Sequence, residues 1–292
     1  MHILYRKRWL IAAGLLPALL VYILFVIFPI FNSVYYSFFD WDGFNEKIWV
    51  GWDNFEELWK DSVFWSSFRH NMIFLLFALF GQLTLGLLFA VVLNGKIIKG
   101  KGIYRSVFFM PVVLSTVVVS LFWSMMYNYQ IGLINNLLIQ LGLDSWVRNW
   151  LGEPGFAVFA ICIALMWQYS GFYMVIFLSA LQSVPADVLE AAEIDGAIGF
   201  RKTWSVTLPM ISGTILTSVA LCISYALKTF DMIFVMTKGG PNHATEVMAT
   251  YMYHSSFSSL RYGYGSAIST AIIVLSFIFI FVSRTIMQKI LR

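Results

Sequence analysis

The residues of this sequence best suited to bind a ligand are polar and aromatic side chains inside or beside long apolar runs. They form two groups: Trp167, Gln168, Tyr169 and Ser170, and Tyr225, Lys228, Thr229 and Asp231. Within a membrane, ionisable groups usually face a cavity or a partner. Aromatic rings can pack on the C–H surface of a sugar while hydroxyl-binding groups meet its edge. We therefore predict that these residues line a path for a polar solute.

A purely structural role for the same residues is equally open. Lys228 and Asp231 are three positions apart and could form a local salt bridge near a membrane surface. Tryptophan and tyrosine also populate interface belts where no ligand binds, and aromatic residues make up 18% of this chain. Residue types alone therefore leave the path and the packing interpretations open.

Catalytic and metal-binding chemistry has little support in the sequence. The apolar runs hold no nucleophile beside a base, no paired carboxylates and no His or Cys cluster at metal-ligand spacing. Cys162 and Cys222 each lie inside an apolar run, where a small core residue is the simpler interpretation than a disulfide. We expect this chain to carry no catalytic residue, no metal and no cofactor.

The stretch from Pro185 to Pro209 is the longest polar interval between two apolar runs that still has the pattern of folded structure. Proline fits the first turn of a helix, and Gly196 can adopt the positive φ that ends one. A second short helix is predicted from Phe200 to Leu208. We therefore expect a helix, a turn and a helix.

The first of these two helices has an acidic face and a face of small residues. Asp187, Glu190 and Glu193 fall within an arc of about 120°. Ala191 and Ala192 lie on the neighbouring face, where small side chains let another surface approach the backbone. A solvated loop helix and a docking element both fit this pattern.

The composition is that of a membrane protein. Hydrophobic residues make up 60% of the 292 residues, charged residues only 12%, and the mean hydropathy is +0.78, whereas soluble domains carry about 25% charged residues. The net charge of +4 must then be considered loop by loop, and it does not indicate nucleic acid.

Six apolar runs are long enough to cross a hydrocarbon core of about 30 Å, which takes about 20 residues. They are Trp9 to Phe31, Met72 to Leu93, Ser106 to Tyr127, Phe156 to Leu181, Leu208 to Leu227 and Gly263 to Val282. We expect the first to be an uncleaved anchor and the polar residues from Trp167 to interrupt the fourth. Asp40 to His70 should form a structured outer loop. The predicted fold class is an all-α membrane protein with six transmembrane helices in a single domain, residues 1–292.

Basic residues predict the orientation of these spans. With both termini in the cytoplasm, most of the 19 lysines and arginines fall on the cytoplasmic side, as the positive-inside rule requires. These residues are Arg6, Lys7, Arg8, Lys96, Lys99, Lys101, Arg105, Arg201, Lys202, Arg284, Lys289 and Arg292. The stretch from Pro185 to Pro209 is then cytoplasmic as well.

A phosphate-loop pattern occurs once, in the basic segment from Gly95 to Lys101. Such a loop requires a preceding strand, a following helix, and Ser or Thr after the lysine. Here Gly102 follows, and the segment comes after a membrane helix. We interpret it as a basic inner loop and expect no ATP binding by this chain.

The order of residues after Pro185 resembles a known motif. Glu190, Ala191, Ala192, Asp195 and Gly196, followed at a fixed distance by Leu208 and Pro209, resemble the EAA loop of the membrane subunits of ATP-binding-cassette (ABC) importers. In that family the loop forms a cytoplasmic coupling helix in a cleft of the ATPase subunit. The resemblance implies the same role for residues 185–209 here.

The carboxy-terminal part resembles the carbohydrate-uptake permeases related to the maltose transporter. The matching segments, in order, are Thr229-Phe230-Asp231, Gly239-Gly240-Pro241, Thr245-Glu246 and Gly263-Tyr264-Gly265. Gly-Gly-Pro after the fifth span is typical of the first of the two permeases in such systems. The resemblance implies a type I importer permease fold in a bacterial cell membrane. Lys228 departs from the neutral polar residue of many relatives, which leaves the solute open.

The function implied by this resemblance is ATP-driven import of a sugar, such as an oligosaccharide. The implied partners are a second, homologous permease, a dimeric ATPase that binds ATP and Mg, and an extracytoplasmic solute-binding protein. One alternative is a permease of the same class for another solute, such as a glycerol-phosphate ester. A secondary carrier is a further alternative, which would require intramembrane carboxylates or inverted repeats.

Overall fold

The computed structural model describes residues 8–95 and 98–290. The basic residues Arg6, Lys7, Lys96 and Arg292 lie outside this range. Helices dominate, with one pair of two-residue strands. The elements are α2 (Arg8–Tyr22), η1 (Ile23–Ile27), α3 (Phe28–Tyr36), β1 (Phe39–Asp40), β2 (Ile48–Trp49), α4 (Asp53–Lys60), α5 (Ser62–Phe77), η2 (Ala78–Leu83), α6 (Thr84–Asn94), α7 (Lys101–Val113), α8 (Thr116–Met126), α9 (Leu133–Gln140), η3 (Asp144–Trp146), α10 (Pro154–Gln182), α11 (Ala186–Ile194), α12 (Gly199–Lys202), η4 (Thr203–Thr207), α13 (Leu208–Met210), α14 (Ser212–Leu227), α15 (Asp231–Met236), α16 (Met248–Tyr253), η5 (His254–Ser258) and α17 (Tyr262–Ile290).

The chain divides into two compact units. The first comprises Met1–Asp61 with Met252–Ile273, and the second comprises Ser62–Tyr251 with Val274–Arg292. The second unit contains both groups of candidate residues and the stretch from Pro185 to Pro209.

In the first unit, the expected outer loop is structured. β1 and β2 pair antiparallel, and the buried Asn54 side chain donates hydrogen bonds of 2.9 Å to the carbonyls of Ser37 and Phe39. In the turn between the strands, backbone N–H groups of Asn45 and then Phe44 donate to the Asp42 carboxylate and hold the pKa of Asp42 below its ordinary value. This small sheet is an addition to the predicted all-α fold.

Among the described residues, five helices are long and apolar enough to cross a membrane, or up to six if one bent pair counts as a span. The second span is longer than predicted, because it already begins at Ser62 and continues through α5, η2 and α6 to Asn94. The fourth is also longer and is uninterrupted: α10 continues through the polar residues Trp167 to Ser170. Their side chains therefore interrupt the apolarity of the helix and not its backbone.

The third span is bent where a straight helix was predicted. α7 and α8 meet at 96°, because Leu114 and Ser115 have ψ near 145° and 135° and so leave the helical conformation. Pro111 lies just before the bend and cannot donate the backbone hydrogen bond that a helix interior requires. The bend separates a half of the span that packs on α10 from a half that packs on α15.

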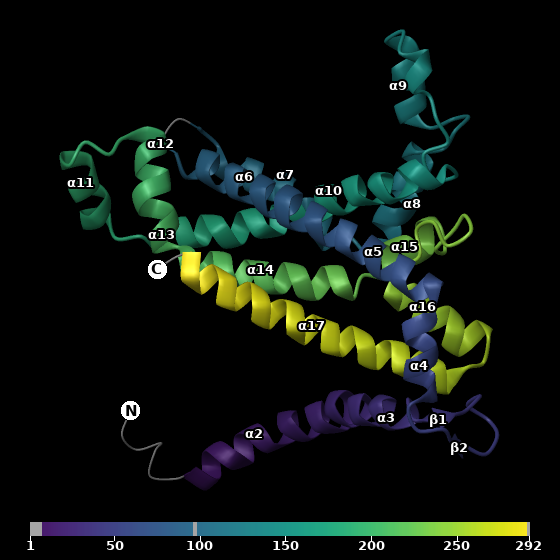
Figure 1. Cartoon of the computed structure of the whole chain (residues 1–292). Coiled ribbons are helices and arrows are strands. Elements are labelled where there is room, and N and C mark those ends of the chain that lie inside the picture. Colours follow the sequence, from purple (N-terminus) through teal and green to yellow (C-terminus); the bar gives the residue numbers. More distant parts are fainter. Residues whose placement is uncertain (1–7, 96–97, 291–292) are drawn as a thin grey trace. The chain divides into compact units, whose positions relative to one another are not determined.

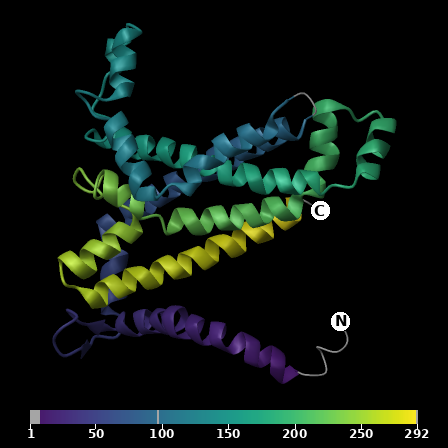
Figure 2. The same cartoon turned by 180° about the vertical axis from the view of Figure 1, so that it is seen from behind.

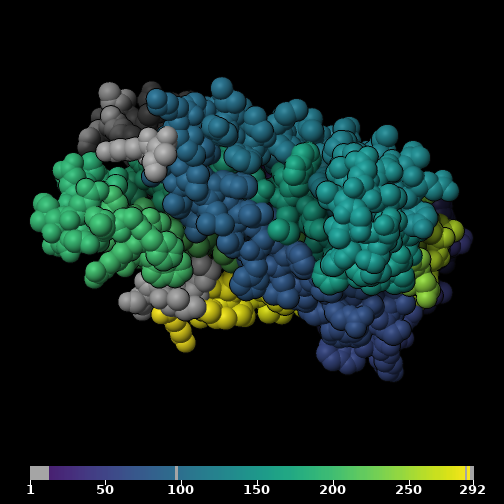
Figure 3. Space-filling model, turned by 90° about the horizontal axis from the view of Figure 1, so that it is seen from above, coloured from purple at the N-terminus to yellow at the C-terminus, as the bar shows by residue number. Residues whose placement is uncertain are grey.

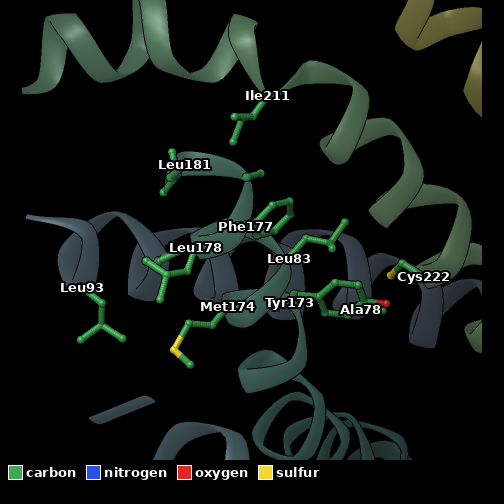
Figure 4. Packing of buried hydrophobic residues seen from close by; sticks show 12 residues of the cluster. Ala78, Leu83, Leu93, Tyr173, Met174, Phe177, Leu178, Leu181, Ile211 and Cys222 are labelled. Atoms are coloured by element: carbon green, nitrogen blue, oxygen red, sulfur yellow. The ribbon is translucent and has the colours of Figure 1, made fainter. Parts of the chain in front are cut away.

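A close backbone contact fixes where α7 crosses α10. A Cβ at Gly171 would lie 1.8 Å from the carbonyl oxygen of Phe108, so only glycine allows this approach. The hydrophobic core of the second unit lies beside this crossing. It contains Ala78, Leu83 and Leu93 of the second span, Tyr173, Met174, Phe177, Leu178 and Leu181 of α10, and Ile211 and Cys222 (Figure 4). Cys162 and Cys222 are buried and unpaired, as expected.

Candidate functional site

Within the second unit, the helices of the stretch from Pro185 to Pro209 lie at the end opposite to α9 and α15. α11, α12 and α13 form one end, and α9 and α15 lie toward the other (Figures 1 and 2). The space-filling view shows the same separation, with residues near 195 in green at one end and residues near 140 in teal at the other (Figure 3). The second unit therefore presents different residues at the two ends of its membrane helices.

The stretch from Pro185 to Pro209 forms the predicted helix, turn and helix. α11 ends in a Schellman motif: the N–H of Ala197 donates to Ala192 at 2.8 Å, and the N–H of Gly196 donates to Glu193 at 3.1 Å. Gly196 has φ of +80°, as predicted. Gly199 also has a positive φ of 56°, which was not predicted from the sequence. The two glycines let the chain reverse between α11 and α12.

The candidate coupling residues differ in exposure. Glu190, Ala191 and Asp195 are exposed, whereas Ala192 is 7% exposed and packs inward. Glu193 of the acidic face pairs with Lys202 at 2.5 Å and so ties α11 to α12. On the return helix, Leu208 packs against the core while Pro209 is exposed.

Exposed apolar side chains surround this turn, and they were not predicted as site residues. They are Ile194, Ile198, Phe200 and Trp204, which are 64% to 87% exposed. The rings of Phe200 and Trp204 stack 6.0 Å apart. The available signal was the presence of several large apolar residues in a polar loop, because an exposed apolar patch marks a protein or membrane contact.

Inside the second unit, three helices bring polar side chains together at the bend of the third span. The Tyr225 hydroxyl of α14 donates to the Tyr169 hydroxyl of α10 at 2.8 Å. Thr116, the first residue of α8, lies 3.4 Å from the Tyr169 hydroxyl and accepts from Gln168 at 3.5 Å. Thr116 was not predicted, although a Ser-Thr pair soon after Pro111 in an apolar run was a signal.

One atom of this polar cluster has no partner. Gln168 is 1% exposed, and its Oε1 accepts no hydrogen bond within the described part of the chain. An unsatisfied buried acceptor costs about 1–3 kcal/mol, which an ordered water or a ligand hydroxyl would offset. The cluster can therefore accept a hydrogen bond from a hydroxyl that reaches it.

Trp167 and Ser170 line a cavity of about 540 Å³ between α7 and α10. Most of the other lining residues are apolar, so this cavity is less polar than predicted. Trp167 is 40% exposed, and its ring lies 6.2 Å from that of Phe122 and 5.9 Å from that of Trp123. The cavity thus offers ring faces, and the polar cluster beside it offers hydroxyl and amide groups.

The candidate residues after the fifth span differ in burial. Thr229 is buried and lies within hydrogen-bonding reach of Tyr225, so it joins the polar cluster. Lys228 and Asp231 are exposed, and they form no ion pair with each other in the part of the chain that the structure describes. Among the described residues, no group of three or more His, Cys, Asp or Glu could hold a metal ion.

The sequence profile for the binding-protein-dependent transport system inner membrane component matches residues 82–292. The chain belongs to this family. The prediction of an ABC importer permease is therefore confirmed, and the chain is a multi-pass membrane protein of the permease type. Its place in the plasma membrane follows from the same membership.

Similar permeases cover nearly the whole chain. The trehalose/maltose transport system permease protein MalF of Thermococcus litoralis is 36% identical over 280 residues, which are 95% of this chain and 94% of the relative. The probable ABC transporter permease protein YurN of Bacillus subtilis is 35% identical, with 90% of each chain covered. The multiple sugar-binding transport system permease protein MsmF of Streptococcus mutans is 34% identical, with 89% of each covered.

A solved structure shows the same fold. A chain of a bacterial ABC transporter involved in the import of the acidic polysaccharide alginate superimposes with a TM-score of 0.86 and 21% identity, and each chain is covered completely. The permease therefore has the predicted ABC importer fold.

Proposed function

We propose that this permease forms half of a translocation path that carries a sugar, such as an oligosaccharide, into the cytoplasm. The observation that carries the proposal is the polar cluster at the bend of the third span, where Gln168, Tyr169, Tyr225 and Thr116 lie beside the Trp167 cavity. Hydroxyl and amide groups next to aromatic rings suit a neutral, hydroxyl-rich solute. Relatives named for trehalose, maltose and multiple sugars support the same solute class.

In this proposal residues 1–292 work as one transmembrane permease domain with both termini in the cytoplasm. Residues 185–209 are its cytoplasmic coupling loop. Support comes from the distribution of basic residues and from the position of α11 to α13 at the opposite end of the second unit from α9 and α15 (Figure 1).

Coupling to ATP hydrolysis is proposed to pass through this loop. Exposed Glu190 and Asp195 would meet basic or N–H donor groups of an ATPase subunit, while Ile194, Phe200 and Trp204 would fill an apolar cleft. Ala191 is exposed and small, so it permits close approach. The partner ATPase dimer would bind ATP and Mg, and this chain would hydrolyse nothing itself.

The remaining proposed partners are a second, homologous permease and an extracytoplasmic solute-binding protein. The two permeases together would enclose the path, because the Trp167 cavity opens at the surface of a single chain. A binding protein of this kind occurs in a similar solved structure, that of a bacterial alginate ABC transporter in complex with a periplasmic protein that holds an alginate pentasaccharide.

Reconstitution tests this function. The permease would be purified with its partner ATPase, second permease and binding protein and placed in proteoliposomes. We expect uptake of radiolabelled maltose or trehalose that requires ATP and the binding protein. Uptake of glycerol 3-phosphate instead would indicate the alternative solute, and uptake driven by an ion gradient without ATP would indicate a secondary carrier.

A further inference from the structure

A second pocket lies at the end of the membrane helices opposite to the coupling loop. It has a volume of about 350 Å³, within the range of about 300–1,000 Å³ of small-molecule sites. It lies between the end of α8 and the start of α10, and we call it the outer pocket. Its lining residues are Ser124, Tyr127, Asn128, Tyr129, Gln130, Asn149 and Leu151.

The rim of the outer pocket is held in place by a single buried side chain. Asn135 is 2% exposed and donates to the carbonyls of Tyr129 at 3.2 Å and Arg148 at 2.9 Å. Its Oδ1 accepts from the Trp150 indole at 2.8 Å. The two segments that form the pocket are thus joined before any ligand arrives, which lowers the ordering cost of binding.

In the rim, the side-chain carbonyls of Asn128 and Asn149 are hydrogen-bonded, whereas their NH₂ groups can still donate. The Oδ1 of Asn128 accepts from the N–H groups of Gln130 and Ile131, and the Oδ1 of Asn149 accepts from the N–H of Gly152 at 3.1 Å. Among the described residues, neither amide NH₂ group has an acceptor. Each offers two donors, and exposed Gln130 adds a donor and an acceptor beside the Tyr129 ring, which is 55% exposed.

The charge of the site selects a neutral ligand. The lining of the outer pocket contains no Asp, Glu, Lys, Arg or His. The nearest basic group, Arg148, lies 4.4 Å above the Phe156 ring and 3.7 Å from Glu153. A phosphate or carboxylate would find no free cation in the lining, and a metal ion would find no carboxylate. Hydroxyl groups match the amide donors and acceptors.

A series of rings connects the outer pocket with the Trp167 cavity. The ring of Tyr127 lies 5.2 Å from that of Trp123, which lies 5.9 Å from that of Trp167. Tyr127 is only 4% exposed, so these ring-to-ring contacts join the wall of the outer pocket to the wall of the Trp167 cavity. Tyr127 directly follows α8, Trp123 lies on α8, and Trp167 lies on α10.

We propose that the outer pocket is an entry subsite that holds one ring of a neutral sugar before the sugar reaches Trp167. The proposal rests on the proposed function and adds to it a second binding position with its own residues. Tyr129 supplies the ring, Gln130 and the amides of Asn128 and Asn149 bind hydroxyls, and Trp123 links the two positions.

Direct binding tests the subsite. Saturation-transfer NMR with maltose and trehalose would be measured on the transporter complex in nanodiscs without its binding protein. Tyr129→Ala and Gln130→Ala should each weaken binding about 3- to 10-fold, the effect of one lost contact. Tyr129→Phe should stay close to wild type, and Gln140→Ala, an exposed amide of α9 away from the pocket, is the matched control. Trp123→Leu should slow uptake and leave binding at the outer pocket unchanged.

The outcomes separate this inference from the proposed function. If wild type imports maltose or trehalose while Tyr129→Ala and Gln130→Ala bind and transport normally, the outer pocket is not a subsite and the proposed function stands. If Gln140→Ala loses as much binding as Gln130→Ala, the effect is not specific and the subsite is refuted. If wild type imports only glycerol 3-phosphate, the proposed function fails and the subsite fails with it.

Discussion

The turn at Gly196 gives a prediction whose size follows from the structure. Gly196 has φ of +80°, and a Cβ placed there meets no heavy atom within 4 Å. A side chain at this position therefore costs backbone strain without a clash. The left-handed conformation costs a residue other than glycine about 1–2 kcal/mol, and a β-branched residue there is a genuine outlier. Gly196→Val should therefore shift the loop away from the conformation described above by a factor of about 5–30.

The rank order of substitutions distinguishes strain from loss of a particular contact. Asn tolerates the left-handed region, so Gly196→Asn should lose less than Gly196→Ala, and Gly196→Val should lose most. Gly213→Val is the matched control, because its Cβ also has open space while its φ is ordinary.

Two measurements on purified complexes test this order: the amount of ATPase that stays bound to the permease, and the ATP hydrolysis stimulated by loaded binding protein. Both should fall in the order Asn, Ala, Val, while each variant still inserts in the membrane. The reasoning is refuted if Val retains full coupling or if Asn is as damaging as Val.

Three further predictions concern the same loop, the topology and the path. Ala191→Trp should block ATPase binding by its bulk while the permease still assembles. Ala192→Trp, at the buried neighbour, should impair assembly itself. Co-purification of the ATPase and the expression level of the permease together distinguish the two outcomes. Lys202→Cys should react with an impermeant thiol reagent only from the cytoplasmic side, and labelling from outside intact cells would overturn the assigned orientation. Tyr225→Phe removes the hydrogen bond to Tyr169 and should lower sugar uptake by about 2- to 10-fold with normal assembly; unchanged uptake would assign this pair to packing.

The positions of the spans could be predicted from the sequence because each span needs an apolar run of sufficient length. The length of that run does not depend on how the helices pack. The turn at Gly196 was predicted for a similar reason: Gly196 ends a helix through its own backbone freedom, and the Schellman hydrogen bonds involve near neighbours only. Local rules of this kind do not depend on tertiary contacts.

The bend of the third span could not be predicted from local pattern alone. Pro111 lies in an apolar run that is long enough for one straight helix, and prolines are tolerated in membrane helices when neighbours satisfy the freed groups. The bend at Leu114 and Ser115 depends on packing against α10 and α15, because these two helices contact the two halves of the span. For the same reason Thr116 was not predicted, because only the bend brings its hydroxyl to Tyr169.

The candidate site is a consequence of two backbone features: the close contact between α7 and α10 at Gly171, and the bend between α7 and α8. At Gly171 the absent Cβ lets α7 lie directly on α10, and this contact fixes one half of the third span. The bend then redirects α8, so that Thr116 meets the polar side chains of α10 while Trp123 reaches Trp167. A straight third span would carry Thr116 and Trp123 along the axis of α7 and separate them from these partners. The bend of the third span therefore supplies the Thr116 hydroxyl that Gln168 and Tyr169 contact, while Gln168 Oε1 keeps its capacity to accept a further hydrogen bond.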